Sequence, residues 1–430
     1  MIEVEERVRR GLSAAAATQH VPVGFDDRVA RRVSVFRRRR VVGRGALVAV
    51  VLAAVIGGVA AFRPDSTSQT TVAGGPATGI TTAPGWHPIA DAPIPPRFEA
   101  LSLAMGDRVL VWGGSAHEAT QVDGAVYDAG HNTWTKVPAS PLFSGDGVGA
   151  WTGRDAIVVS GQSGVVVAAA YNPDTNSWRK LATPPLANGA SAMNHAVWTG
   201  TELVVVGVAD EGDTIGTVNQ VAVYDPATGA WRRGSVPSGP LPDFGDAVWT
   251  GSEVAVVGNV GTSGKSAGHD TVQLYNPVTD RWREIPWGLD GVRGNLVVAW
   301  IGTRLFVGGG RGAHRDAALV DPATGTWDRV PDAPIAFEGN DRYAELWTGT
   351  AVLTMNGADN RPLTFDPLTH VWRVGPASPD GVRRDAVSWA WAGTSHTAVV
   401  WSGGLSANEK PGITSCCTPI EGGETYTPTS

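Results

Sequence analysis

The clearest pattern in the chain is a set of short apolar runs separated by turn signals, seen best between residues 198 and 231. Trp198-Thr199-Gly200 opens a tight turn, Leu203 to Val206 is an apolar run, and Tyr224-Asp225-Pro226 leads through a second turn to Trp231. Gly and Asp-Pro mark turns, and short apolar runs between them are typical of buried strands. The cassette predicts a four-stranded antiparallel unit.

This cassette occurs seven times. Its first turn recurs at Met105-Gly106, Trp151, Trp198, Trp249, Trp300, Trp347 and Trp391. The residue before the second turn is aromatic in six copies and valine in one: Tyr127, Tyr171, Tyr224, Tyr275, Val320, Phe365 and Tyr426. The closing tryptophans are Trp86, Trp134, Trp178, Trp231, Trp282, Trp327 and Trp372, spaced 44 to 53 residues apart. That period is typical of four-stranded β-propeller blades, which bury their faces against one another around an axis.

The two ends of the repeat indicate how the ring closes. Trp86 has no tyrosine before it, and Tyr426 has no tryptophan after it. We therefore expect an N-terminal strand to complete the last blade, which leaves no open sheet edge. The prediction is an all-β, seven-bladed propeller over residues 85–430.

The cassette resembles the Kelch repeat, as found in the central domain of galactose oxidase. The resemblance rests on an apolar strand that ends in a glycine pair (Gly113-Gly114, Gly308-Gly309, Gly403-Gly404), followed by Tyr and then Trp. The second, third, fourth and sixth copies lack the full pair. The resemblance raises copper-radical oxidation, which needs tyrosines at the metal. Five of the six tyrosines fill the repeat position and only Tyr343 lies outside it, so no metal or cofactor is expected.

The first 84 residues predict a membrane anchor. Residues 1–40 form a basic segment that ends in four arginines, 41–62 form an apolar span, and 63–84 are rich in Ser, Thr, Gly, Ala and Pro. About 20 apolar residues cross a bilayer, and flanking arginines keep their side in the cytoplasm. We expect a signal anchor with a cytoplasmic N-terminus, a flexible linker and an extracytoplasmic propeller; cleavage after Ala61 is the weaker alternative. The Arg- and Ala-rich composition is typical of high-GC bacteria.

Charge separates the anchor from the propeller. Residues up to 62 carry 11 Arg and 5 acids, a net charge of +6, which leaves −13 for the remainder. An acidic propeller does not favour nucleic acid as a partner.

Acids and amides repeat between the Tyr and Trp positions, as in Asp225-Pro226 and Asn276-Pro277. Their position favours turn capping over metal binding.

One set of polar residues is brought together only by the predicted fold. In a propeller, the loop leading into each innermost strand lines one mouth of the axial channel. These lead-in loops carry Arg97 and Glu99, Asp146, Asn194 and His195, Asp246, Arg293 and Asn295, Asp341 and Arg342, and Arg384 and Asp385. Two interpretations stay open, a merely wet rim and a cup for a polar ligand such as a sugar or a peptide. The mixed charge disfavours a purely anionic ligand.

The two cysteines, Cys416 and Cys417, are adjacent. In an exported domain they favour a vicinal disulfide that stiffens the last blade's long loop, and a reduced pair that binds soft metals is the alternative.

No nucleophile elbow, zinc motif or phosphate loop occurs in the chain. The sequence therefore favours a membrane-anchored binding or scaffolding module for a protein or carbohydrate over an enzyme. The first alternative is a Kelch-fold sugar-processing enzyme, such as a mutarotase or epimerase, that uses Arg, Asp and His at the mouth as acid and base. The second is a transmembrane sensor with a cytoplasmic partner.

Overall fold

A computed structural model describes the repeat region of the chain. The described residues are 83–116, 119–143, 145, 147–162, 165–186, 192–210, 217–242, 244–260, 268–338, 346–356, 360–381, 384, 387–405 and 418–429. The predicted basic segment 1–40, the span 41–62 and the linker up to residue 82 lie outside them. Within the described residues, no helix is long and apolar enough to cross a membrane.

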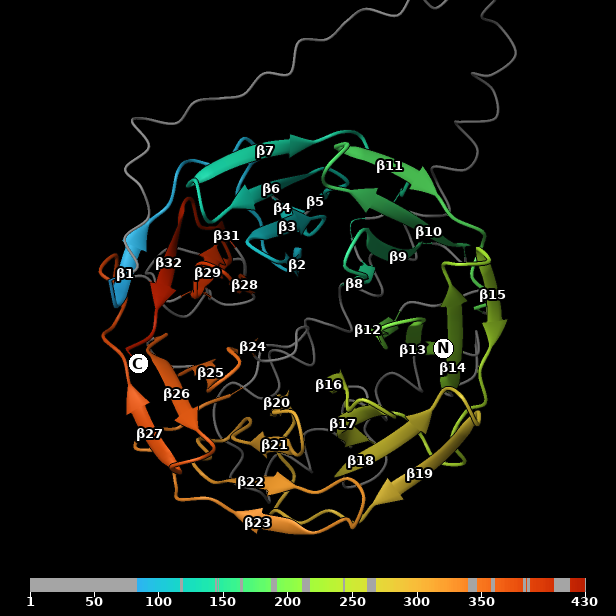
Figure 1. Ribbon diagram of the computed structural model, residues 1–430, viewed down its shortest axis with the longest axis vertical. Coiled ribbons are helices and arrows are strands. Elements are labelled where there is room, and N and C mark those ends of the chain that lie inside the picture. The colour runs from blue at the N-terminus through green and yellow to red at the C-terminus, as the bar shows by residue number, and fades with distance from the viewer. Residues whose placement is uncertain are drawn as a thin grey trace, which may run out of the picture. The chain divides into compact units, whose positions relative to one another are not determined.

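Seven four-stranded antiparallel sheets form a ring (Figure 1). Blade 1 consists of β2 (Leu101–Met105), β3 (Arg108–Trp112), β6 (Gly124–Asp128) and β7 (Thr133–Val137). Blade 2 consists of β8 (Gly147–Trp151), β9 (Ala156–Gln162), β10 (Val165–Asn172) and β11 (Ser177–Lys180). Blade 3 consists of β12 (Ala192–Trp198), β13 (Leu203–Asp210), β14 (Thr217–Asp225) and β15 (Ala230–Arg233). Blade 4 consists of β16 (Phe244–Trp249), β17 (Val254–Val260), β18 (His269–Asn276) and β19 (Arg281–Ile285). Blade 5 consists of β20 (Val297–Trp300), β21 (Leu305–Gly308), β22 (Ala317–Val320) and β23 (Trp327–Arg329).

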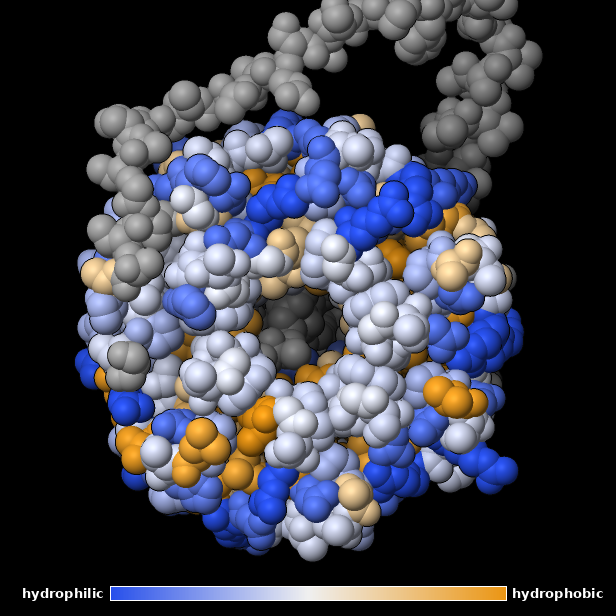
Figure 2. Space-filling view, viewed as in Figure 1, coloured by the Kyte–Doolittle hydropathy of each residue, from blue (hydrophilic) through white to orange (hydrophobic). Residues whose placement is uncertain are grey.

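The remaining strands complete the ring. Blade 6 consists of β24 (Leu346–Trp347), β25 (Val352–Met355), β26 (Pro362–Asp366) and β27 (Val371–Val374), and blade 7 of β28 (Ser388–Ala392), β29 (Thr397–Trp401), β32 (Gly423–Thr427) and β1 (Gly85–Pro88). Two short hairpins extend from blades 1 and 7: β4 (Ser115–Ala116) with β5 (Ala119–Thr120), and β30 (Gly404–Leu405) with β31 (Thr418–Pro419). A space-filling view along the same direction shows an opening at the axis of the ring (Figure 2).

The N-terminal strand closes the ring, which confirms the prediction from the repeat ends. In Figure 1 the blue β1 lies beside the red β32. Trp86 pairs with Tyr426 in antiparallel register, and their rings lie 4.9 Å apart. The Trp86 indole also donates a hydrogen bond to the Pro376 carbonyl at 2.9 Å. First and last strands thus complete one sheet, and no blade in the described ring has fewer than four strands.

The repeated aromatic residues hold neighbouring blades together. The Tyr or Phe and the closing Trp of a blade lie opposite each other on adjacent strands, as in Tyr224 with Trp231, whose rings are 4.9 Å apart. The indole of the closing Trp then donates a hydrogen bond to the chain leaving the preceding blade. These indole bonds are Trp86 to Pro376, Trp134 to Ala90, Trp231 to Ala182, Trp282 to Ser235, Trp327 to Pro286 and Trp372 to Pro331. Trp178 is the exception, because its buried indole nitrogen has no partner within the described chain.

The Asp and Asn residues after the repeat tyrosines are turn caps. The Asp225 carboxylate accepts hydrogen bonds from the Ala227 amide at 2.8 Å and the Thr228 hydroxyl at 2.9 Å. Asn276 accepts the amides of Val278 and Thr279 in the same way. Side chains of this length bond backbone amides two and three residues ahead and so fix the turn. The structure confirms the turn interpretation at these positions.

Candidate functional site

The innermost strands of all seven blades begin at one end of their blades, as the antiparallel order requires. The second strand of a blade returns to that end, so the loop between the second and third strands lies there too. The fourth strand also finishes there. One face of the ring therefore collects three types of segment, and we refer to it as the lead-in face.

Arginines at equivalent positions in blades 1, 5 and 7 are buried on this face. Arg97, Arg293 and Arg384 each lie four residues before the innermost-strand residue that pairs with the end of the second strand. Each donates from Nη1 to the carbonyl that follows the second strand: Gly113 at 3.1 Å, Gly309 at 3.4 Å and Ser402 at 3.1 Å. We name this arrangement the arginine latch. It ties a lead-in loop to its own blade.

Acids complete the latch. Arg97 pairs with Asp123 at 2.8 Å, and Arg384 pairs with Asp380. Arg293 makes more of these bonds. Its Nη1 and Nη2 donate hydrogen bonds to the Asp316 carboxylate at 2.9 and 2.7 Å, and its Nε and Nη2 donate to the Asp290 carbonyl. Paired geometry of this kind is the strongest that Arg and carboxylate form. Arg97 and Arg384, predicted as mouth ligands, are thus buried and bonded within the protein; Arg97 is 0% exposed, and of its nitrogens Nη2 alone has no partner among the described residues.

Two further predicted residues, both buried, each have one side-chain atom that lacks a hydrogen-bond partner in the described part of the chain. His195 on β12 and Asp246 on β16 occupy the same register position in neighbouring blades, opposite Val206 and Val257. They are 9% and 2% exposed, and neither His195 Nε2 nor Asp246 Oδ2 has a hydrogen-bond partner among the described residues. Burial lowers the pKa of His195 to about 4. Burial also raises the pKa of the Asp246 carboxyl well above its usual value.

A β-bulge next to His195 explains why it sits in register with Asp246. The pairing of β12 with β13 skips one residue between Met193 and His195. A bulge shifts the strand by one position and so changes which face a side chain takes. Asn194, also predicted at the mouth, is the extra residue.

Glu99 and Asn295 have a common backbone role. Each lies two residues after a latch arginine and adopts a left-handed backbone, with φ of 56° and 46°. Asn295 is 8% exposed. Asn tolerates this conformation better than most residues, because its short polar side chain bonds locally. The predicted ligand residue Asn295 therefore stands at a tight bend of the lead-in loop.

The other predicted site residues lie outside the described part of the chain. These are Asp146, Asp341, Arg342, Asp385, Cys416 and Cys417. The mouth and disulfide predictions for them stay predictions.

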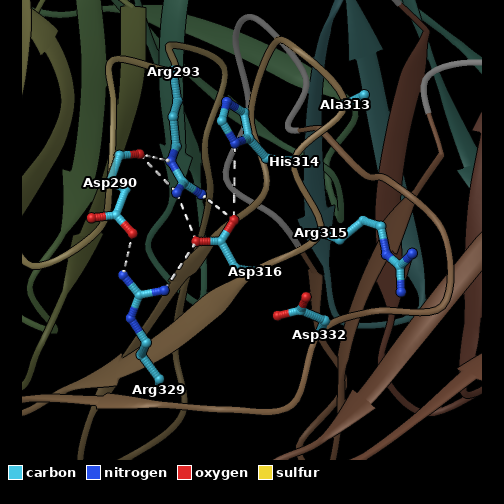
Figure 3. Close-up of a pocket in the computed structure, with 8 residues that line it drawn as sticks. All are labelled: Asp290, Arg293, Ala313, His314, Arg315, Asp316, Arg329 and Asp332. Carbon is cyan, nitrogen blue, oxygen red and sulfur yellow. Dashed lines mark hydrogen bonds and ion pairs between the residues drawn. The ribbon is translucent and has the colours of Figure 1, made fainter.

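The lead-in face of blade 5 contains an open, shallow pocket of about 390 Å³, which we call the cavity (Figure 3). Its lining comes from the lead-in loop, from the loop between β21 and β22, and from β23 with the segment that follows it. The lining residues are Asp290, Arg293, Ala313, His314, Arg315, Asp316, Arg329 and Asp332. Three arginines and three aspartates balance in formal charge.

An ion-pair network forms one side of this cavity. Asp316 joins Arg293 as described, and Arg329 donates to the Asp290 carboxylate at 2.7 Å while lying 3.8 Å from Asp316. Burial alone would raise the pKa of Asp316, but the hydrogen bonds and charge of Arg293 outweigh it and hold the pKa below its usual value. His314 lies 3.9 Å from Asp316, and burial together with the charge of Arg293 lowers the pKa of His314. His314 is therefore neutral at neutral pH.

Backbone strain marks the same loop. Ala313 lines the cavity with a φ of 64°, and Gly312 before it has a φ of 109°. A left-handed backbone costs a residue with a Cβ about 1–2 kcal/mol. Strain of this kind persists where the surroundings enforce it and clusters at functional sites.

Sequence reasoning missed most of this cavity. Only the latch arginine Arg293 belonged to the predicted mouth. The available signal was the run Gly308 to Asp316, which is rich in charge and glycine, together with the rule that loops after a second strand reach the same face as lead-in loops.

Comparison with known proteins supports the fold. No family model matches the chain. Among solved structures, the chain is similar to a fungal alcohol oxidase of the AA5 family, solved in complex with copper. The TM-score is 0.54 at 14% identity, over 80% of this chain and 76% of that one. The similarity covers the fold alone and is consistent with a Kelch-type propeller.

Proposed function

We propose that the protein is a membrane-anchored binding module whose propeller presents the lead-in face to a polar ligand outside the cytoplasm. The anchor is the span 41–62, and the linker 63–84 lets the propeller stand off the membrane. The ligand is a protein or a carbohydrate.

One observation carries the binding function, the charged cavity on blade 5. Binding sites are concave and place a few polar groups at fixed positions. Here the buried Arg293 and its partner Asp316 form one wall, and Ala313, with its left-handed backbone, lies in the same loop as Asp316. Mixed charge with zero formal balance favours a ligand that is polar but not strongly charged in one sense.

The binding function is tested with the full chain in detergent. Envelope saccharides and peptides are titrated while thermal unfolding is followed, using the wild type and the Arg315→Ala, Asp332→Ala double variant. A ligand that raises the Tm of the wild type and not of the double variant supports the site. Equal shifts in both proteins would remove the cavity from consideration.

The anchor is tested separately with a reporter enzyme fused after Ser430. The arginine-rich flank predicts reporter activity outside the cytoplasm. Activity inside the cytoplasm would overturn the topology, and a mature N-terminus near Ala61 would replace the anchor with secretion.

Acid–base catalysis on a small sugar is the second candidate function. The observation in its favour is the pair His195 and Asp246, whose pKa values are shifted in opposite directions at one register position. Strongly shifted pKa values gather at functional sites. Polarimetry of glucose and galactose mutarotation with the full chain tests it, and a rate unaffected by Asp246→Asn would exclude this pair from the chemistry.

A further inference from the structure

Two charged groups in the blade 5 cavity stay outside the ion-pair network. Figure 3 shows Arg315 and Asp332 apart from the linked group of Arg293, Asp316, Arg329 and Asp290. Arg315 uses only Nε, which donates to the Ala333 carbonyl at 2.6 Å. Asp332 forms no hydrogen bond or ion pair with any described residue, although its negative charge helps to raise the pKa of Arg329. Both side chains are exposed.

Backbone hydrogen bonds nevertheless hold the main chain at these two residues together. The Ala333 amide donates to the Arg315 carbonyl at 2.8 Å, while the Arg315 side chain donates to the Ala333 carbonyl. These reciprocal bonds join Arg315 to the residue that follows Asp332. The Phe337 amide donates to the His314 carbonyl and secures the same loop. Preorganised groups lose less conformational entropy when a ligand binds.

The rest of the lining limits the class of ligand that the cavity can bind. His314 is neutral, and the network's charges are satisfied within the protein. None of the eight described lining residues is Phe, Tyr or Trp, so the cavity offers a neutral sugar no large aromatic side chain to stack on. A ligand with a single negative charge would meet Asp332, and one with a single positive charge would meet Arg315.

We propose that the cavity binds a peptide segment that carries a carboxylate and a cationic group together, the carboxylate at Arg315 and the cation at Asp332. The proposal rests on the binding function proposed above and specifies its ligand. Neither terminal nitrogen of the Arg315 guanidinium has a partner among the described residues, and together they can bind a carboxylate in paired geometry. Asp332 accepts an ammonium or guanidinium group.

The test uses the full chain in detergent and four blocked tetrapeptides: Glu-Gly-Gly-Lys, Gln-Gly-Gly-Lys, Glu-Gly-Gly-Gln and the charge-reversed Lys-Gly-Gly-Glu. Affinity is measured by ligand-observed NMR titration. We expect a peptide with both charges to bind about fivefold more tightly than either peptide with one charge, since a partly shielded ion pair contributes about 1 kcal/mol.

Protein variants assign each charge to its partner. Arg315→Gln should remove the preference for Glu over Gln and keep the preference for Lys, and Asp332→Asn should do the reverse. Matched controls are Arg281→Gln and Asp91→Asn, which change exposed residues outside the cavity. Both controls should keep wild-type affinities.

The outcomes separate the ligand class from the binding function. If both variants keep the full charge preference, the assignment of Arg315 and Asp332 is wrong. If an uncharged saccharide binds the wild type and is lost in the double variant, the binding function stands and the peptide proposal fails. If neither peptides nor saccharides bind, both proposals fail.

Discussion

The lead-in face buries polar groups in two contrasting ways. In blades 1, 5 and 7 the latch arginines are enclosed by carbonyls and, in each case, a carboxylate. In blades 3 and 4, His195 and Asp246 are enclosed as completely but have no partner for Nε2 or Oδ2 within the described chain. Hydrogen bonds and ion pairs offset the free-energy cost of burying a charged group. Where a buried group lacks them, its pKa shifts so that the neutral form is favoured. The latches therefore stabilise the ring, whereas the other two groups reduce its stability.

The largest effect is expected from breaking a latch. Arg293→Ala removes the guanidinium and leaves Asp316 and the Gly309 carbonyl without their donors. Removing one partner of a buried pair costs about 3–5 kcal/mol. Urea unfolding of the full chain should show a decrease of that size. The exposed Arg281→Ala should change the unfolding free energy by no more than about 0.5 kcal/mol, and equal effects of the two changes would refute the latch.

A smaller effect is expected from His195 as the pH falls. Its pKa of about 4 in the folded protein lies below the unfolded value of about 6.5, so between these pH values the unfolded chain binds more protons. The contribution of neutral His195 to the unfolding free energy is fully present above pH 6.5. It decreases by about 3 kcal/mol as the pH falls toward 4. His195→Gln should remove this loss in urea midpoints measured from pH 7 to 4. An unchanged pH profile would contradict the burial of a neutral histidine.

Asp246 should act in the opposite sense. Its pKa is raised in the folded protein, so the folded chain binds more protons above the unfolded value of about 3.9. Stability from this group is present below pH 4 and is lost as the pH rises toward the folded pKa. Asp246→Asn should therefore raise the unfolding free energy at pH 7, with little change at pH 4. A loss of stability at pH 7 would mean that the carboxylate has a partner.

The smallest effect is expected at the free acid of the cavity. Asp332→Ala removes a side chain without hydrogen bonds in the described structure, so the unfolding free energy should change by no more than about 0.5 kcal/mol. Ligand binding should nevertheless weaken. A large loss of stability would show that Asp332 supports the fold and would weaken its assignment to a ligand.

The repeat made the ring predictable from the sequence. Because Tyr and Trp recur at fixed positions, the lone Trp86 and Tyr426 were enough to predict the pairing of β1 with β32. The turn roles of Asp225 and Asn276 followed from their positions in the same repeat. Strand positions and turn chemistry depend on local sequence, which the chain displays seven times.

The directions of side chains in the lead-in loops were not predictable in this way. The sequence placed Arg97 and Arg384 in the right loops, but their burial depends on the acids and carbonyls of other segments. Asp123 lies 26 residues after Arg97, and Asp316 lies 23 after Arg293. Loops between second and third strands differ in length among blades, so the repeat does not align them. The cavity residues of blade 5 were missed for that reason.

The closing strand has a consequence for synthesis. The Thr425 hydroxyl donates to the His87 carbonyl across 338 residues of chain, and such distant pairs form late because the intervening chain must first be brought together. Blades 1 to 6 are each contiguous, so each can form its sheet while the ribosome is still adding residues. Blade 7 cannot, because its outer strand β1 precedes blade 1 in the chain and its partner β32 follows blade 6. Until β32 has been synthesised, β1 has no strand to pair with, and a chain that stops before β32 would form an open ring whose exposed edges invite aggregation.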